Sequence, residues 1–246
     1  MSATSWVHAL ALGIDPSWRR RPGDLRSAEL RAFGAALEAQ DVTTLSYSLI
    51  GRVPGADLLL WRLGASLDGL EEAAAAALRS GLGAWCEVSH SFLGLVQGSP
   101  YVRPPVDSVP ALFSGERRRH LVVYPFTKRA DWYLLPDDAR RRSMGEHIRV
   151  GRRHHEVRQL LANSFGLGDH DFLVAYETDD LPAFSELVRE LRGTDSRRWV
   201  HSDVPILVGR LRTVTELGRL LGTETVSGRE RQNGRPAIAA TAGWGR

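Results

Sequence analysis

HLVVYPFTKRADWYLLPDDARRRSMGEHIRVGRRHHEVRQ, residues 120–159, is the stretch from which the rest of the chain can be understood. It begins with an apolar run that ends at Tyr124-Pro125, and such a run predicts a β-strand. Residues 136–150 carry Pro136 in the first turn, followed by two aspartates, which is typical of a helix start. A further strand is predicted for residues 156–164. The stretch therefore predicts strand, helix and strand in succession.

Lys128 stands out within this stretch because it is the only lysine among 32 lysine and arginine residues. A lysine ammonium shifts its pKa readily on burial, whereas an arginine guanidinium does not. The plain interpretation is that a single lysine remains at this position by chance. The functional interpretation is that the position needs the chemistry of a lysine side chain. The position of Lys128 between Tyr124 and Trp132 favours the functional interpretation.

Outside this stretch, the hydrophobic pattern predicts the order strand, helix, strand, strand, helix, strand, and it predicts that order twice. The first set comprises strands at 5–13, 43–51, 57–63 and 85–96, with helices at 27–40 and 67–79. The second set comprises strands at 119–126, 156–164, 172–178 and 204–211, with helices at 136–150 and 181–192. Two β-α-β-β-α-β units predict an α+β fold in which two ferredoxin-like halves pack as an α+β barrel.

The predicted boundaries follow from this pattern. Residues 1–97 form an N-terminal ferredoxin-like half, and residues 119–214 form a C-terminal half that carries the candidate site. Residues 98–118, rich in proline, are predicted to connect the halves. Residues 222–246 are rich in Gly, Arg and Thr without periodicity, and we expect a mobile tail there.

Composition narrows the class of protein. With 43% hydrophobic residues and a net charge of +3, the chain can bury a core and is not strongly basic. Its arginines form short runs rather than one long stripe, which favours a solvated surface over a nucleic-acid interface. The single cysteine, Cys86, excludes an intramolecular disulfide framework, and no Cys/His cluster has the spacing of a zinc site. Without a convincing signal peptide or a long apolar run, a cytoplasmic protein with no membrane span is expected.

Several residues of the 120–159 stretch are candidates for chemistry, although each also has a plainer interpretation. His147, near the end of the predicted helix, could ligate iron, but a helical histidine is more often structural or exposed. Tyr124 is either a buried core tyrosine or a redox-active phenol. Trp132-Tyr133 could begin a helix or form an aromatic wall for a flat macrocycle. Only their order along the chain distinguishes these alternatives.

That order resembles the chlorite-dismutase-like haem family, and within it the coproheme decarboxylases. The resemblance is strongest over residues 120–210, and it is weaker over residues 56–61 and 91–101. It implies the two-half fold predicted above and an assembly as a homopentamer. The motifs that carry it are Tyr124-Pro125-Phe126-x-Lys128, Trp132-Tyr133-x-Leu135-Pro136, Glu146-His147-x-x-x-Gly151-Arg152, Val157-Arg158-Gln159, Ser164-Phe165-Gly166 and Leu191-Arg192.

The resemblance implies a role for four residues near the reacting groups. His147 matches the histidine that binds the haem iron. Asp195 matches the acid that accepts the second N–H of that histidine, although the family more often has glutamate there. Tyr124 matches the tyrosine whose radical takes a hydrogen atom from a propionate of the substrate. Lys128 matches the lysine beside that propionate.

Three further residues are implied to line the haem pocket. Trp132 matches a tryptophan of the pocket wall, and Arg192 an arginine on the propionate side. Gln159 falls at the distal position, where true chlorite dismutases carry arginine. Arg158 is its neighbour, but on a strand the two side chains should face opposite sides.

The expected function is therefore peroxide-dependent oxidative decarboxylation of iron coproporphyrin III (coproheme) to haem b, with hydrogen peroxide as the second substrate. Coproheme would be both substrate and redox cofactor. The alternatives are a chlorite-dismutase-like or peroxidase-like haem enzyme, or a non-catalytic haem-binding relative. Two positions depart from the family pattern. Ser108 stands where actinobacterial relatives have a histidine, and Arg197 stands where a small hydroxyl residue is common.

Overall fold

The computed structural model describes residues 5–96, 113 and 116–223. The first part of the chain forms β1 (Ser5–Ile14), α1 (Gly23–Glu38), β2 (Thr43–Val53), β3 (Ala56–Gly64), α2 (Leu67–Arg79) and β4 (Cys86–Val96). The second part forms β5 (His120–Lys128), α4 (Ala130–Leu134), α5 (Asp137–Gly151), β6 (Arg158–Asn163), β7 (Phe172–Thr178), α6 (Leu181–Arg192), β8 (Val200–Ser202), β9 (Leu207–Leu211) and α7 (Val214–Leu221).

The strands form one antiparallel sheet in the order β7-β6-β4-β1-β3-β2-β9-β5-β8, and β7 also pairs with β5. This last pairing closes eight strands into a barrel and leaves β8 as an extension of β5. The barrel consists of two four-stranded sheets, β4-β1-β3-β2 and β6-β7-β5-β9, which have the strand order of a ferredoxin-like unit. Only one residue pair joins β4 to β6, and two join β2 to β9. The predicted α+β barrel of two ferredoxin-like halves is confirmed.

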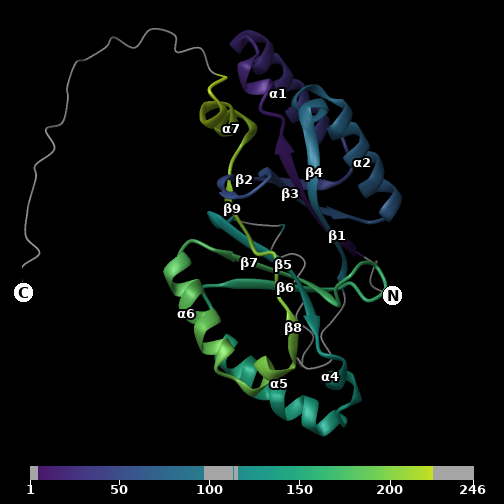
Figure 1. The fold of residues 1–246 in the computed structure, drawn as a ribbon, viewed down its shortest axis with the longest axis vertical. Coiled ribbons are helices and arrows are strands. Elements are labelled where there is room, and N and C mark those ends of the chain that lie inside the picture. Colours follow the sequence, from purple (N-terminus) through teal and green to yellow (C-terminus); the bar gives the residue numbers. More distant parts are fainter. Residues whose placement is uncertain (1–4, 97–112, 114–115, 224–246) are drawn as a thin grey trace, which may run out of the picture.

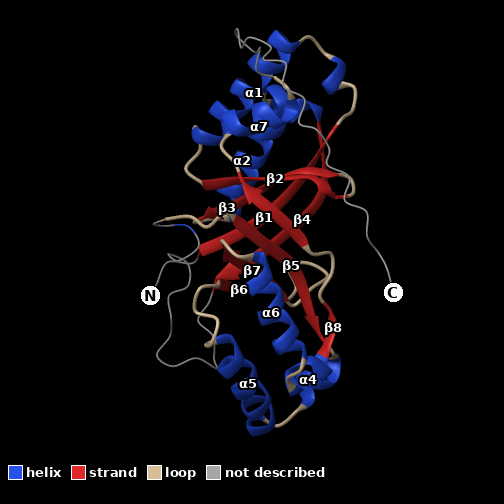
Figure 2. Cartoon of the chain, turned by 90° about the vertical axis from the view of Figure 1, so that its left-hand side faces the viewer, coloured by secondary structure: helices blue, strands red, loops and turns tan. Residues whose placement is uncertain are grey.

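The helices lie outside the barrel, in two groups. Figures 1 and 2 show the strands in the middle of the molecule, with α1, α2 and α7 at one end and α4, α5 and α6 at the other. Alternate strand residues point to opposite faces, so each sheet supplies one face to the barrel interior and one to its helices. In β5, Leu121 and Val123 belong to the barrel core, whereas Val122 packs toward α5 and α6. This alternation sets the direction of Tyr124.

The chain returns to its first half at α7. Leu217 and Leu221 of this helix join Leu30 and Phe33 in the hydrophobic cluster that covers the first sheet. The Arg26 guanidinium donates hydrogen bonds to the carbonyls of Leu221 and, across the turn, Gly222. Gly222 ends the helix with a φ of 66°, a left-handed conformation that glycine adopts without strain.

Most element bounds differ from the sequence-based expectation by a few residues. Helix α1 begins at Gly23, four residues before the predicted start, and in the strand predicted for 204–211 pairing begins only at Leu207. Pro205 has no N–H for a strand ladder, which explains the shortening. Two short elements, α4 and β8, were not predicted because five and three residues show no period.

The proposed segment boundaries stay predictions. Most of the connecting loop predicted at 98–118, including Ser108, lies outside the described residues, as does the tail from residue 224 onward. Over the described ranges, no helix is both long and apolar enough to cross a membrane.

Candidate functional site

Tyr124 points from β5 toward the helices α5 and α6. Its ring stacks beside Tyr176 of β7, with 6.3 Å between the ring centroids, and Tyr176 in turn contacts Phe184 of α6 at 5.2 Å. Burial raises the pKa of Tyr124 well above its usual value of 10, and the neighbouring Tyr176 raises this pKa further. The phenol therefore keeps its proton at neutral pH and is available as a hydrogen-atom or proton donor.

Lys128 ends the same strand and is anchored at both its backbone and its side chain. Its backbone N–H donates to the Asp171 carboxylate at 2.7 Å, and its Nζ donates to the carbonyl of Ser196 at 3.4 Å. The ammonium lies 4.4 Å from the centroid of the buried Trp132 ring, within range of a cation–π interaction. Burial, followed by repulsion from Arg197, lowers the pKa of Lys128 to about 8. Lys128 therefore remains mostly protonated at pH 7 but titrates near the physiological range.

His147 projects from α5 toward the segment between α6 and β8. Its Nδ1 lies 3.1 Å from the Ser196 hydroxyl, which lies 3.0 Å from the Thr194 hydroxyl. Thr194 uses its one hydroxyl proton to donate to the Leu191 carbonyl at 2.7 Å. Ser196 must then donate to Thr194, so Ser196 accepts from Nδ1–H of His147. This proton count assigns the Nδ1–H tautomer and leaves a lone pair on Nε2.

The protonation state of His147 suits a metal ligand. Burial, and next the positive charge of Lys128, lowers the pKa of His147 to about 4, so the imidazole is neutral at pH 7. A neutral imidazole with one N–H held by a partner is the form that coordinates iron. Over the described residues, no group of three or more His, Cys, Asp or Glu side chains could hold a metal ion. A single neutral imidazole is a ligand of the kind that binds an iron already held in a macrocycle.

Asp195, predicted to accept the second N–H of His147, occupies a different position in the structure. Its backbone N–H donates to the Glu146 carboxylate at 3.0 Å, and its own carboxylate lies 3.7 Å from Nε of Arg198. The partner of the His147 imidazole is Ser196, one residue further along. The ligand-holding role of Asp195 stays a prediction, and the structure favours Ser196 for it.

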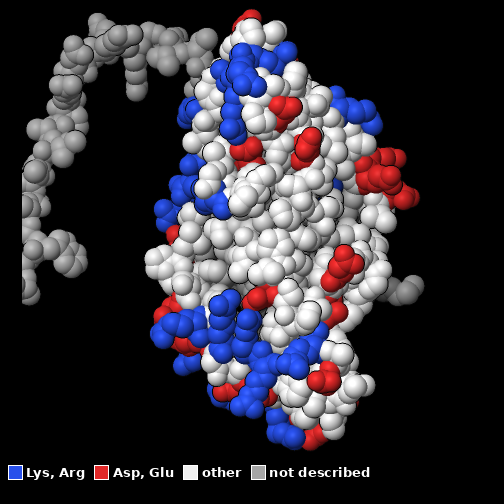
Figure 3. Space-filling view, in the orientation of Figure 1, with Lys and Arg blue, Asp and Glu red and all other residues white. Residues whose placement is uncertain are grey.

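A basic edge borders the Tyr124 and Lys128 side chains. Nη2 of Arg192 lies 3.5 Å from the Asp203 carboxylate, and Arg197 donates to the same carboxylate at 2.6 Å. The charges of Asp203 and Arg192 also act on the pKa of Tyr124, so the two lie close to the phenol. Figure 3 shows lysine and arginine side chains gathered over α5, α6 and β8. An anionic group near Tyr124 would thus meet guanidinium groups.

Gln159 and Arg158 face opposite sides of β6. Gln159 pairs with Tyr176 across the ladder, which places it on the face that carries Tyr124. Arg158 pairs with Glu177 and lies 3.7 Å from its buried carboxylate. The exposed Gln159 side chain therefore borders the candidate site, and the Arg158 cation does not.

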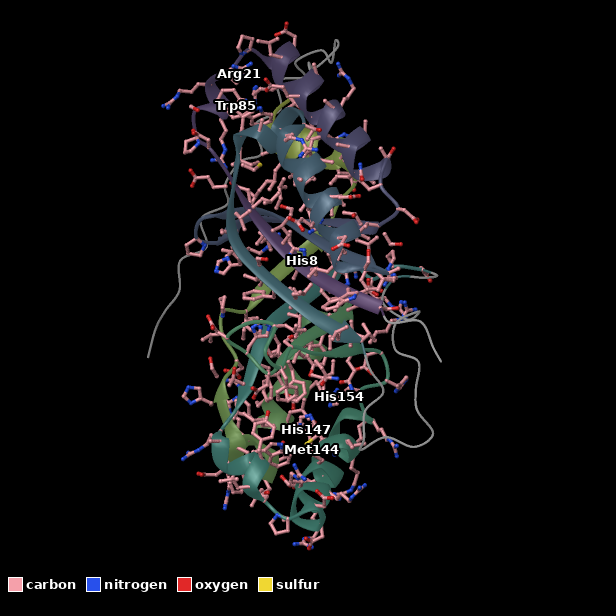
Figure 4. All side chains as sticks on the ribbon, turned by 90° about the vertical axis from the view of Figure 1, so that its right-hand side faces the viewer. His8, Arg21, Trp85, Met144, His147 and His154 are labelled. Atoms are coloured by element: carbon pink, nitrogen blue, oxygen red, sulfur yellow. The ribbon has the colours of Figure 1, made fainter. Side chains whose placement is uncertain are left out.

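The structure thus brings Tyr124, Lys128, Trp132 and Arg192 to one region around β5, and it links Lys128 to His147 through Ser196. Figure 4 shows His147 in the half of the molecule that contains α5. Sequence reasoning missed Ser196, Tyr176 and Asp203. No spacing signal marks these three, since each acts only through a contact made by the fold.

The comparisons with known proteins agree with this geometry. Residues 26–212 match the family model described as chlorite dismutase, which covers most of the chain. The chain belongs to the chlorite dismutase family.

Within the chlorite dismutase family, the chain is 30% identical over 165 residues to the coproheme decarboxylase of Mycolicibacterium smegmatis, covering 66% of this chain and 70% of that protein. It also resembles the structure of chlorite dismutase from Candidatus Nitrospira defluvii in complex with imidazole. That likeness has a TM-score of 0.80 at 25% identity, and it covers 88% of this chain and 94% of the other. A double mutant of the same enzyme gives a TM-score of 0.77 at 26% identity, over 88% and 95% of the two chains. The family thus includes at least two different enzymes.

Proposed function

We propose that the protein decarboxylates iron coproporphyrin III to haem b, with hydrogen peroxide as the oxidant. The observation that carries this proposal is the double contact of Ser196, whose hydroxyl meets His147 and whose carbonyl accepts from Lys128. It joins a candidate iron ligand to a candidate propionate partner. The similarity to a coproheme decarboxylase supports the same choice.

The residues of the site fit such a substrate. His147 would bind the iron through Nε2, and Ser196 would hold the imidazole in the tautomer that leaves Nε2 free. Trp132, buried beside Lys128, supplies an aromatic wall of the kind that packs against a flat ring. When bound, the substrate's own iron would supply the redox chemistry with peroxide.

The protein's cations would orient the propionates. Lys128 and Arg192 are the two candidates, because both are near Tyr124 and neither is fully neutralised by a carboxylate at hydrogen-bond distance. Among the described residues, the Nζ of Lys128 donates only to the Ser196 carbonyl, and Nη2 of Arg192 lies 3.5 Å from the Asp203 carboxylate. A carboxylate that binds between them would gain charge-assisted hydrogen bonds.

Tyr124 would take part in the reaction itself. Its raised pKa keeps the phenol protonated, so the phenol can give up a hydrogen atom and then recover one from the propionate side chain. Overall, one propionate, one hydrogen peroxide and one proton give a vinyl group, carbon dioxide and two waters. Two such rounds convert coproheme to haem b.

Gln159 distinguishes this proposal from chlorite decomposition. A cation at the distal position would help to hold a chlorite anion, and the neutral Gln159 cannot do so. The nearest cation along the strand, Arg158, is turned to the buried Glu177. A haem-binding protein without catalytic activity is the other alternative. We further propose a cytoplasmic homopentamer, as the resemblance implies.

One experiment separates these alternatives. The purified protein is mixed with coproheme and then titrated with peroxide, while carbon dioxide and porphyrin products are measured. The proposal predicts carbon dioxide release and a vinyl-containing product that Tyr124→Phe fails to form. A non-catalytic binder would show coproheme absorbance changes without either product.

A further inference from the structure

A cavity of about 810 Å³ lies on the side of β5 opposite to Tyr124. Pro125 and Thr127 of β5 line it, and strand alternation turns these two away from the face of Tyr124. Its other walls come from β1, β3, β4 and α2 of the first half and from residues 167–170, 201–202 and 204–205 of the second. Figure 4 labels His8, one of the lining residues, near the middle of the molecule. The cavity is thus distinct from the candidate haem site.

A buried arginine in this cavity has no counter-ion within the described part of the chain. Arg62 is 1% exposed, and its Nη1 donates to the Leu70 carbonyl at 3.0 Å. Its Nη2 contacts Nδ1 of His8, and its Nε has no hydrogen-bond partner among the residues that the structure describes. No carboxylate of the described ranges comes within ion-pair distance of Arg62. Although burial lowers the pKa of Arg62 to about 10, the guanidinium is charged at neutral pH. A buried charge without a partner is costly, so an anion in the cavity beside Arg62 would be stabilised.

The strand register adds a hydroxyl donor beside Arg62. His8 lies opposite Arg62 on β3 and opposite Leu93 on β4, so Ser91, two residues from Leu93, shares their face. Because His8 Nδ1 accepts from Arg62, His8 Nε2–H donates to Ser91 Oγ at 2.9 Å. Burial lowers the pKa of His8 to about 3, so His8 adds no charge. The Ser91 O–H is then free to donate to an anion.

A second buried nitrogen without a partner lines the same cavity. Nε2 of His170 is buried and lacks a hydrogen-bond partner among the described residues. The His170 ring packs edge-on against Phe92, with 5.7 Å between the centroids. Burial lowers the pKa of His170, so this ring is neutral at pH 7 and adds no charge to the cavity. Buried polar atoms without partners are uncommon in folded proteins, so these two nitrogens mark a polar part of the cavity wall.

The remaining walls limit which anion would fit. Apolar side chains of Leu67, Leu93, Leu167 and Val204 line the cavity, and its volume is in the range of small-molecule sites. Glu71 and Asp169 also line it, and both are exposed at its surface. These two carboxylates would repel a multiply charged anion, whereas one buried guanidinium matches a single negative charge. The walls therefore favour a ligand that has an apolar chain and a single anionic group.

We propose that this cavity binds an organic monocarboxylate. The carboxylate accepts a hydrogen bond from Oγ of Ser91 and faces the uncompensated positive charge of Arg62, and the apolar chain lies against Leu67, Leu93 and Leu167. Nothing in this proposal depends on the haem chemistry of the opposite face of β5.

Calorimetric titration of the full-length protein with octanoate tests the proposal. Octan-1-ol has the same alkyl chain as octanoate but no charge, and inorganic phosphate is charged but has no alkyl chain. Octanoate is expected to bind saturably with one site per chain, and octan-1-ol and phosphate at least about tenfold more weakly. Arg62→Met should weaken octanoate binding by about tenfold or more, and Ser91→Ala by a smaller factor. His155→Ala, on an 89% exposed side chain, is the control and should bind as the wild type does.

Three results would overturn the proposal. Equal binding of octanoate and octan-1-ol would show that the charge of Arg62 plays no part. Undiminished octanoate binding in both Arg62→Met and Ser91→Ala would place the ligand elsewhere. The Ser91→Ala titration keeps the test valid if Arg62→Met does not fold. Absence of octanoate binding, together with dissociation of the protein in sedimentation when Arg62 is replaced, would indicate a carboxylate from a second copy of the chain instead.

Discussion

The Nδ1 atom of His147 lies 3.1 Å from the hydroxyl oxygen of Ser196. The hydroxyl chain that continues through Thr194 to the Leu191 carbonyl fixes Ser196 as the acceptor. A hydroxyl acceptor withdraws the Nδ1 proton less than a carboxylate would, so the imidazole stays neutral and does not approach imidazolate. We infer that iron bound at Nε2 would receive less electron density than in relatives with a glutamate partner.

Replacing Ser196 tests this relationship. Ser196→Ala removes the partner that orients His147, and haem affinity is expected to fall by about tenfold, because outer-shell partners typically contribute that much. His147→Ala should abolish the Soret signal of the bound form. His155→Ala, which alters an exposed histidine, is the control. Unchanged affinity and an unchanged spectrum in Ser196→Ala would show that Ser196 does not position the ligand.

The two stacked tyrosines allow a matched comparison for Tyr124. Tyr124→Phe removes the phenol proposed to react, while Tyr176→Phe removes its buried neighbour 6.3 Å away between centroids. Coproheme binding should persist in both variants. Decarboxylation should fall by at least about a thousandfold in Tyr124→Phe, equivalent to about 4 kcal/mol in the barrier, and by much less in Tyr176→Phe. Single-turnover kinetics with peroxide would measure the decarboxylation rate of both variants. Equal losses of rate would show that Tyr124 is not the reacting phenol.

Because of Lys128, both the affinity for coproheme and the free energy of unfolding should depend on pH. The folded state lowers the pKa of Lys128 from 10.5 to about 8, so between these values the unfolded chain holds a proton that the folded chain has lost. The free energy of unfolding contributed by Lys128 therefore rises with pH from about 8 to 10.5. Coproheme affinity should fall over the same rise in pH above 8, because the propionate loses its cation.

Urea unfolding and coproheme titration at pH 7 to 10.5 would measure these two trends. Lys128→Met should remove the rise in stability across the window and weaken coproheme binding at pH 7. Lys128→Arg should keep its charge up to pH 10.5, so its coproheme affinity should not fall there. Identical pH profiles for the wild type and Lys128→Met would contradict the pKa assigned to Lys128.

The barrel interior contains a buried acid whose loss should be costly. Glu177 is 1% exposed and accepts from Nε and Nη2 of Arg117 at 3.0 and 2.6 Å. Glu177→Gln breaks this pair and should lower the free energy of unfolding by about 3 kcal/mol. Glu186→Gln breaks only an exposed pair with Arg189, so it should cost about 0.5 kcal/mol or less. Chemical denaturation measures both, and similar losses would show that the buried pair contributes little.

The sequence predicted the fold because each strand and helix that forms the barrel carries its own hydrophobic period. Helix α2 and strand β7 were predicted with the bounds observed, Leu67–Arg79 and Phe172–Thr178. The closure of the barrel was predicted only as a fold class, because the seams between β4 and β6 and between β2 and β9 rest on few residue pairs.

The site was predictable where residues form a local motif. Tyr124, Lys128 and Trp132 follow one another within nine positions, and the resemblance to a known family identified them. Ser196 could not be found in this way, since its hydroxyl meets His147 only after α5 and the segment following α6 pack together. Asp195 was predicted for this role because the resemblance matches sequence positions and not side-chain directions. The uncompensated Arg62 likewise becomes visible only through burial.

Carbon dioxide release from coproheme is the most direct test of the proposed function. Anaerobically prepared protein–coproheme complex is titrated with hydrogen peroxide, and the carbon dioxide and porphyrin products are quantified per chain. The proposed reaction predicts two carbon dioxide molecules and one haem b for every two peroxides consumed, with none from Tyr124→Phe. Consumption of peroxide with no carbon dioxide and with all four propionates retained would contradict it.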